Sequence, residues 1–147
     1  MTFTIRPLTP EDKAGWELLY AGYARFYGVT QTAQMRQTVW DWLQDDAHEV
    51  NGLVAEREGT LIGLAHFRPF YAPLAAQKRG FLDDLYVDPA ARGSGTAAAL
   101  IKGVSDEGRK RGWALIRWIT AENNYRARGL YDQVATQTPW VTYDIPL

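Results

Sequence analysis

The chain has 147 residues, which suits one compact domain over residues 1–147 rather than two domains. Hydrophobic residues make up 46% and charged residues 22%, a balance typical of a folded globular protein, and the net charge of −1 argues against a nucleic-acid partner. The absence of cysteine excludes disulfides, thiolate metal sites and a cysteine nucleophile. No apolar stretch has the roughly 20 residues of a membrane helix, and the first residues lack a signal-peptide layout, so we expect a cytoplasmic protein with no membrane partner.

The first part of the chain predicts one strand and two helices. Apolar and polar residues alternate over residues 3–6, as they do in a short strand. Thr9-Pro10 then supplies a capping residue and a first-turn proline, so a helix should begin there and end near Gly28. A second helix is predicted over residues 34–43.

The middle of the chain predicts three strands. Residues 53–57 and 61–67 flank Glu58-Gly59, a pair suited to a tight hairpin turn, so these two strands should pair antiparallel. Residues 71–80 contain proline and glycine and are interpreted as a loop. The next strand covers residues 81–87 and ends before a proline-containing turn.

The last part of the chain predicts two helices and two strands. Apolar spacing indicates a helix over residues 93–111, a strand over 113–119, a short helix over 124–134 and a closing strand over 140–143. The complete order is strand, two helices, three strands, helix, strand, helix, strand. This order indicates an α/β fold with a mixed sheet and helices on both of its faces.

A turn rich in small residues, 87–97, joins a predicted strand to a predicted helix. Small side chains let several backbone N–H groups converge on one point, and the positive end of the helix favours a phosphate there. Arg92 can add a charge-assisted contact. A sharp corner that binds nothing would have a similar composition, so the turn alone leaves both interpretations open.

Two sequence patterns identify a family. Arg92-Gly93-Ser94-Gly95-Thr96-Ala97 fits an Arg or Gln, two residues, Gly, one residue, then Gly or Ala, set between a strand and a helix. Residues 124–131 contain an Asn, then Ala, then Leu-Tyr on a short helix. Together they resemble the two signatures of the GNAT (GCN5-related) N-acetyltransferase superfamily, whose first signature is the acyl-CoA pyrophosphate loop. The run from Leu82 to Val87 is most similar to the polyamine, thialysine and Hpa2-like acetyltransferases.

The resemblance implies a fold and a cosubstrate. The expected fold is a single-domain GNAT fold, α/β, with a mixed, mostly antiparallel sheet that is split at the acetyl-CoA site. The implied cosubstrate is acetyl-CoA, held largely by main-chain groups. The residues implied to contact it are Leu85, Tyr86, Val87, Arg92, Gly93, Ser94, Gly95, Thr96, Ala97, Asn124 and Tyr131.

The resemblance also implies catalytic roles. Tyr131 would protonate the departing thiolate, although a tyrosine on a short helix can equally be a packing residue. Asp83 stands where the polyamine-type enzymes carry a Glu, so it is the candidate base, acting directly or through water. Adjacent strand residues face opposite sides, so Asp83 and Asp84 share one pocket only if a bulge intervenes, and either can instead be a surface ion pair. Candidate acceptor-binding residues are Tyr27, Asp84 and Tyr71.

The implied activity is transfer of an acetyl group from acetyl-CoA to a primary amine of a small molecule, polyamine or amino-acid-like, by direct attack in a ternary complex. The alternatives are a protein lysine or N-terminal acetyltransferase and a non-catalytic acyl-CoA-binding regulatory module. The family resemblance favours a homodimer and implies no metal. His48 and His66 receive no role, because neither has a partner at ligand or triad spacing. The connection over residues 132–140 is longer than in many relatives, which leaves the acceptor open.

Overall fold

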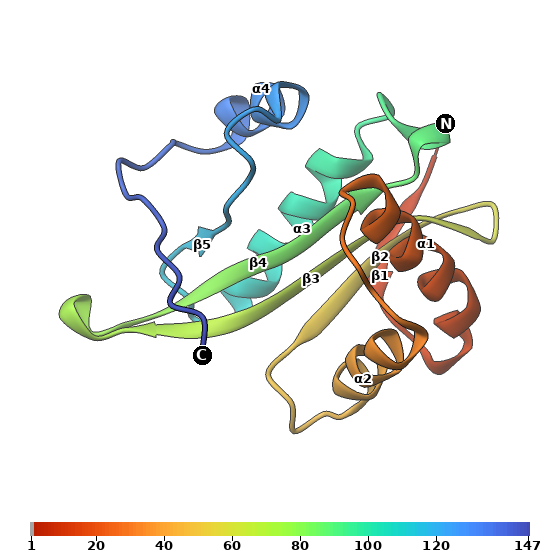
Figure 1. The fold of residues 1–147 in the computed structure, drawn as a ribbon, viewed down its shortest axis with the longest axis horizontal. Helices are drawn as coiled ribbons and strands as arrows, with labels where there is room; N and C mark the ends of the chain where they lie inside the picture. Colours follow the sequence, from red (N-terminus) through yellow and green to blue (C-terminus); the bar gives the residue numbers. More distant parts are fainter. Residues whose placement is uncertain (1) are drawn as a thin grey trace.

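A computed structural model describes residues 2–147, which form a five-stranded sheet in the order β1-β2-β3-β4-β5 (Figure 1). The strands are β1 Thr4–Pro7, β2 Asn51–Arg57, β3 Thr60–Ala72, β4 Gln77–Val87 and β5 Ile116–Arg117. The helices are α1 Lys13–Phe26, α2 Ala33–Gln44, α3 Thr96–Lys110 and α4 Tyr125–Val134. Strands β1 to β4 pair antiparallel and β5 pairs parallel to β4, so the predicted mixed, mostly antiparallel sheet is confirmed.

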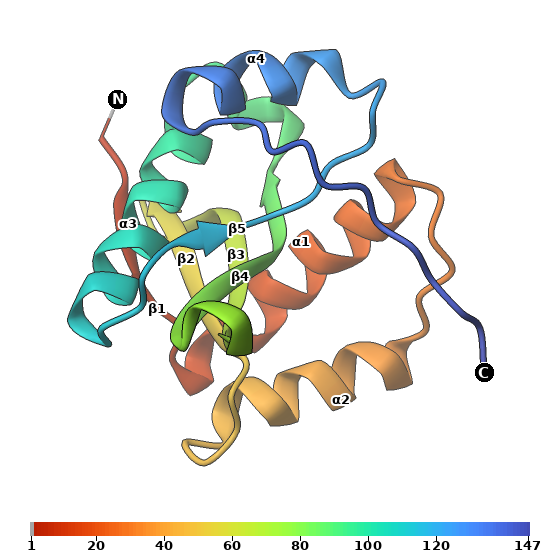
Figure 2. The same cartoon turned by 90° about the vertical axis from the view of Figure 1, so that its left-hand side faces the viewer.

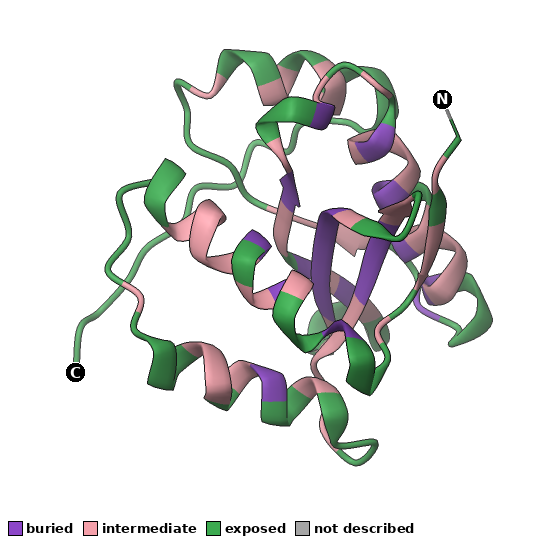
Figure 3. Cartoon of the chain, turned by 90° about the vertical axis from the view of Figure 1, so that its right-hand side faces the viewer, coloured by how far each residue is buried: buried purple, intermediate pink, exposed green. Residues whose placement is uncertain are grey.

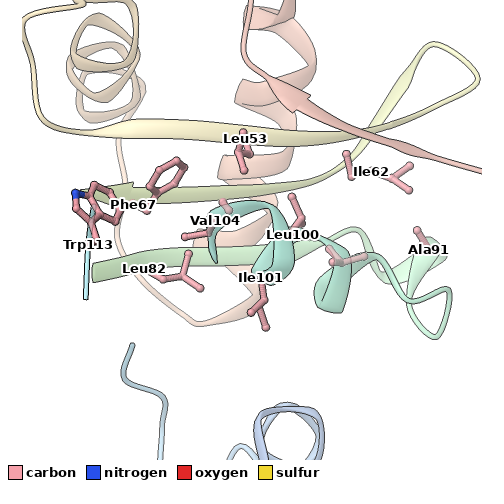
Figure 4. Close-up of a cluster of buried hydrophobic side chains, with 12 residues drawn as sticks. Leu53, Ile62, Phe67, Leu82, Ala91, Leu100, Ile101, Val104 and Trp113 are labelled. Carbon is pink, nitrogen blue, oxygen red and sulfur yellow. The ribbon is translucent and has the colours of Figure 1, made fainter. Parts of the chain in front are cut away.

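Helices cover both faces of the sheet, as predicted. Helices α1 and α2 lie on one face, and α3 and α4 on the other (Figures 1 and 2). Because successive strand residues point to opposite faces, the strands contribute to two apolar cores. The core under α1 and α2 contains Trp16, Leu19, Trp40, Val54, Leu64 and Tyr86. The core under α3, drawn in Figure 4, includes Leu53, Phe67, Leu82, Leu100, Val104 and Trp113. Within residues 2–147, no helix has the length and apolar character needed to cross a membrane.

Helix α3 packs closely on the sheet because β3 presents a glycine beneath it. A Cβ atom on Gly63 would lie 3.0 Å from Leu100 Cδ1, 3.1 Å from the Tyr86 carbonyl oxygen and 3.3 Å from Thr96 Cγ2. The side chains of Thr96 and Leu100 are almost completely buried at this contact. The close approach fixes the first turn of α3 against β4.

Strands β3 and β4 form a longer hairpin than the sequence indicated. The prediction of a loop over residues 71–80 is wrong, because pairing continues through Tyr71↔Lys78 and Ala72↔Gln77. Only the 3-10 turn Pro73–Ala75 and Ala76, which adopts φ 53°, lie outside the two strands. The proline sits in the turn, where no ladder hydrogen bond is lost.

The sheet separates between β4 and β5, which confirms the predicted split. The two parallel strands pair only at Gly80↔Ile116 and Phe81↔Arg117. Beyond Phe81, the rest of β4 has a strand neighbour on the β3 side alone. The strand predicted over residues 113–119 therefore shrinks to two residues, because the chain leaves β4 to pass around the split.

The closing strand predicted over residues 140–143 is wrong. The chain after α4 is extended but carries no secondary structure, and Figure 3 shows it exposed along its length. Trp140, Val141 and Tyr143 are 76%, 74% and 87% exposed. The alternating pattern of a strand is present, but the tail makes no ladder with any strand of its own sheet.

Replacing Gly80 by Ala should destabilise the protein and loosen β5. A Cβ at this position would overlap the ring of Trp113 and lie 2.7 Å from Ile116 Cδ1, so we expect a loss of about 1–3 kcal/mol in the free energy of unfolding. Gly129→Ala on α4 is the matched control, because nothing lies within 4 Å of its Cβ position. We expect the control to be neutral or stabilising by up to about 1 kcal/mol. Chemical denaturation measures both, and equal effects would contradict the packing argument.

Candidate active site

The loop before α3 adopts the conformation that exposes backbone N–H groups. Gly93 and Gly95 have φ angles of 81° and 85°, in the left-handed region that favours glycine. Gly95 caps α3 and its carbonyl accepts the first helical bond, from the Ala99 N–H. The N–H groups of the first turn of a helix have no intrahelical partner, and they carry the positive end of the helix dipole. The loop is therefore a binding point for an anion.

A cavity of about 390 Å³ opens in front of this loop. It lies where β4 and β5 separate, and its walls come from the C-terminal part of α1, the end of β4, the first turn of α3, and α4. The lining residues that the sequence had singled out are Tyr27, Leu85, Tyr86, Val87, Arg92, Gly93, Gly95, Thr96, Ala97, Asn124 and Tyr131. A larger groove of about 860 Å³ lies between α1 and the β2–β3 turn and contains none of residues 92–97.

The residues around the cavity fit a pyrophosphate and its organic arm. Arg92 and Arg126 both line it and supply positive charge. The Arg92 guanidinium lies 4.4 Å from the centre of the Phe26 ring, so it is held at the rim by a cation–π contact. Ser94 does not line the cavity, because its hydroxyl bonds inside the loop, to the Ala91 carbonyl and to Thr96 Oγ1. Its side chain stabilises the loop, while neighbouring main-chain groups face the cavity.

Helix α4 brings Asn124 and Tyr131 to the cavity. Asn124 caps the helix, accepting from the Ala127 N–H, and its amide donates to the Tyr27 hydroxyl at 3.3 Å. Tyr131 is half-buried, and its ring meets Trp118 edge to face at 5.4 Å. Burial raises the pKa of Tyr131, with a smaller contribution from Tyr27. The phenol therefore keeps its proton at neutral pH, as a proton donor must.

A β-bulge decides where the two adjacent acids of β4 point. His66 pairs with Asp84 and Phe67 pairs with Leu82, so Asp83 is an extra residue without a partner in the register. Bulges bend the strand and turn side chains that would otherwise alternate. The sequence pattern allowed Asp83 and Asp84 to face the same side only if a bulge intervened, and the bulge is present.

Both carboxylates consequently lie on the face covered by α1. Asp84 Oδ2 accepts from the Tyr20 hydroxyl of α1 at 2.8 Å and lies 2.8 Å from His66 Nδ1 of β3. Asp83 receives the Nε–H of Arg68, which lies two residues beyond His66 on the same face of β3. Asp84 directly precedes Leu85, the first residue of β4 that lines the cavity.

The surroundings shift the pKa values of Asp83 and Asp84 in opposite directions. Burial raises the pKa of Asp83, and the neighbouring Arg68 only partly offsets it. Burial acts in the same sense on Asp84, but hydrogen bonds from His66 and Tyr20 outweigh it and lower the pKa of Asp84. Adjacent carboxyl groups with diverging pKa values are suited to different tasks, because one holds a proton more readily and the other stays ionised.

The structure separates the other sequence candidates. Tyr27 lies at the cavity, next to Tyr23 in an edge-to-face contact at 5.0 Å. Tyr71 lies near the far end of the β3–β4 hairpin, 67% exposed and beside Lys78, and does not line the cavity. His66, which the sequence left without a partner, is buried between Trp16 and Asp84. Only long-range pairing reveals these partners, so spacing along the chain gave no signal for them.

Comparisons with known proteins identify the family of the chain. The sequence profile of the Acetyltransferase (GNAT) family matches residues 16–135. The D-amino-acid N-acetyltransferase HPA3 of Saccharomyces cerevisiae is 27% identical over 141 residues, covering 95% of this chain and 88% of the yeast protein. The uncharacterised N-acetyltransferase YhfO of Bacillus subtilis is 28% identical, covering 88% of this chain and 86% of its own. The crystal structure of a ribosomal-protein-alanine N-acetyltransferase from Brucella melitensis biovar Abortus 2308 superposes with a TM-score of 0.82 at 26% identity over the whole of both chains.

The chain therefore belongs to the GNAT acetyltransferase family. It is an N-acetyltransferase that uses acetyl-CoA as its cosubstrate.

Replacing Gly95 by Ala should weaken acetyl-CoA binding. An L-residue is strained at a φ of 85°, and relaxation of that strain would turn the N–H groups at the start of α3 away from the cavity. We expect a loss of roughly tenfold in affinity, the equivalent of about 1–2 kcal/mol, measured by calorimetric titration with acetyl-CoA. Gly59→Ala in the β2–β3 turn is the control, because it has a similar φ of 78° and open space around it. If the two variants bound acetyl-CoA with equal affinity, the loop conformation would have no role in binding.

Proposed function

We propose that the enzyme acetylates the primary amine of a small molecule, and that this molecule is a free amino acid. The observation that carries the proposal is the pair of carboxylates on one face of β4, directly before the cavity wall. Two carboxylates beside the expected acetyl group attract a cationic amine. The similarity to the yeast D-amino-acid N-acetyltransferase, over nearly all of both chains, supports this class of acceptor.

The proposed reaction is direct attack within a ternary complex. An alkylammonium with a pKa near 10.4 has no free lone pair, so it must first lose a proton. Asp83 accepts that proton, directly or through water, and its raised pKa makes it the better base of the two acids. The amine nitrogen bonds to the acetyl carbonyl carbon and loses its second proton to solvent as the amide forms. The carbon–sulfur bond breaks as Tyr131 gives its proton to the leaving sulfur, and the phenol then regains a proton from solvent. The Leu85 main-chain N–H is the proposed donor to the carbonyl oxygen.

The terminal nitrogens of Arg68 favour an acceptor that carries a carboxylate. Its Nε bonds Asp83, while within residues 2–147 its two terminal nitrogens have no hydrogen-bond partner. Arg68 lies two residues beyond His66 on the same face of β3, a separation of about 7 Å along a strand. An amino acid has its ammonium and carboxylate on the same carbon, so one molecule can reach Asp84 and the guanidinium together. A planar guanidinium is well suited to such a carboxylate.

The proposed function is tested by acceptor-dependent release of free CoA from acetyl-CoA. The panel comprises D- and L-amino acids, polyamines, aminoglycosides and peptides with free N-termini. We expect turnover with amino acids, and Tyr131→Phe should lower kcat by roughly 10²-fold while leaving acetyl-CoA affinity unchanged. Turnover with peptides alone would replace the free amino acid by a protein N-terminus as the acceptor; the Brucella enzyme is named as a ribosomal-protein-alanine N-acetyltransferase. If the protein bound acetyl-CoA but acetylated no acceptor, the alternative of a non-catalytic acyl-CoA-binding module would replace the proposed function.

We also propose that the enzyme assembles as a homodimer through the segment after α4. Val141, Tyr143, Ile145 and Leu147 alternate along the tail and form one apolar side, and each is at least 74% exposed. Leaving these apolar side chains in water is unfavourable, because burial contributes roughly 25 cal/mol for each Å² of apolar surface. Strand β5 has no neighbour on its outer edge, so a second copy offers the tail a partner strand. Reciprocal exchange of two tails gives a closed, symmetric pair.

Replacing Tyr143 and Ile145 by Ser should convert the dimer to a monomer. We expect light scattering after size exclusion to give twice the 16.6 kDa chain mass for the unaltered protein and the single mass for the variant. Leu74→Ser is the control, because Leu74 is fully exposed at the tip of the β3–β4 hairpin, away from the tail. An unaltered protein that is monomeric at micromolar concentration would reject the dimer.

The proposal also treats residues 1–147 as one N-acetyltransferase domain that works in the cytoplasm. The single five-stranded sheet, whose strands span Thr4 to Arg117, supports the single domain. The need for acetyl-CoA, a metabolite of the cytoplasm, supports the location.

A further inference from the structure

A chain of polar side chains runs from the core under α1 to the open side of β4. Trp16 Nε1 donates to His66 Nε2 at 2.9 Å, His66 Nδ1 meets Asp84 Oδ2 at 2.8 Å, and the Tyr20 hydroxyl donates to the same oxygen. Trp16 is completely buried and His66 is 2% exposed, whereas the Asp84 side chain retains 24% of its exposure. The network therefore begins in the core and ends at a carboxylate that solvent can reach.

The indole fixes the direction of every hydrogen bond in the network. An indole N–H can only donate, so His66 Nε2 must be the acceptor and the ring proton must lie on Nδ1. The Nδ1–H then donates to Asp84 Oδ2. Protonation of Nε2 would place two donors against each other at the Trp16 end. His66 therefore acts as a fixed hydrogen-bond donor to Asp84.

The network leaves half of the Asp84 carboxylate free. Both hydrogen bonds reach Oδ2, and within residues 2–147 Oδ1 has none. The next residue in the chain, Leu85, lines the cavity. The Tyr23 side chain lies between the two regions, because its ring is 6.3 Å from that of Tyr20 and 5.0 Å from that of Tyr27, which lines the cavity. Within residues 2–147, an anionic oxygen is thus left without a hydrogen-bond partner one residue before the cavity wall.

We propose that Asp84 binds the ammonium group of the acceptor, and that His66, Trp16 and Tyr20 are positioning residues that hold its carboxylate in place. This inference rests on the proposed function and names the residue that recognises the amine. Asp84 binds the ammonium group before the reaction, and the neighbouring Asp83 takes the proton. Hydrogen bonds to the ionised form keep Asp84 charged, which suits a binding group and makes it a poor base.

The test separates binding of the acceptor from chemistry. Asp84→Asn keeps the shape of the side chain and removes its charge, so we expect the KM for an amino acid to rise about tenfold or more, with kcat and acetyl-CoA affinity close to those of the unaltered enzyme. Asp83→Asn should do the reverse, lowering kcat with little change in KM. Asp106→Asn, an exposed carboxylate on α3 paired with Lys102, is the control and should change neither.

A neutral acceptor distinguishes charge recognition from a general disturbance of the site. Aminooxyacetate resembles an amino acid, but its amine is uncharged at neutral pH. We expect its KM to be the same in the unaltered enzyme and in Asp84→Asn. An equal rise of KM for the charged and the neutral acceptor would overturn the inference, as would an unchanged KM for the amino acid.

Two replacements of His66 test the positioning network. The amide of His66→Gln can accept from Trp16 and donate to Asp84, so this variant should retain a KM within about threefold. His66→Leu can do neither, so its KM for the amino acid should rise towards that of Asp84→Asn while acetyl-CoA still binds. Equal KM values for the Gln and Leu variants would remove His66 from positioning. If the unaltered enzyme acetylates no amine, the proposed function itself fails; if it does and Asp84→Asn leaves KM unchanged, only this inference fails.

Discussion

The structure depends on the way β4 is paired along its two edges. Its β3 edge is hydrogen-bonded over nearly the full length of the strand, whereas its β5 edge is paired only near Gly80 and Phe81. The bonded edge makes β4 a rigid part of the sheet, and the free edge leaves room for the cavity beside Leu85 to Val87. Main-chain groups on such an edge are available to a ligand, since no neighbouring strand uses them. The position of the cavity follows from this asymmetry.

Much of the fold and of the acetyl-CoA site could be predicted from the sequence, because the signals are local. Periodicity gave all four helices and the β2–β3 hairpin, and small residues between β4 and α3 indicated an anion-binding turn whose glycines do adopt positive φ. Asn124 and Tyr131 were implied by the resemblance of residues 124–131 to the second family signature, and both line the cavity. Such features require only neighbours in the chain.

The features that could not be predicted depend on partners far away in the sequence. Asp83 and Asp84 alternate like any strand residues until the register with β3 shows the bulge between them. His66 has no suitable neighbour along the chain, yet its side chain is hydrogen-bonded to Trp16 and Asp84, 50 and 18 residues away. The tail around Trp140 has the composition of a strand, but a strand also needs a partner, and the composition cannot say which chain supplies it.

The short pairing of β5 has a consequence for the order in which substrates bind. Helix α4 follows a segment that only two register pairs attach to the sheet, so the wall carrying Asn124 and Tyr131 has less local support than α3. Acetyl-CoA would touch both walls of the cavity and join them, and the surface against which an amine must settle is complete only afterwards. We therefore expect an ordered kinetic scheme, with acetyl-CoA adding first and CoA leaving last, in which the cosubstrate also serves as part of the acceptor site.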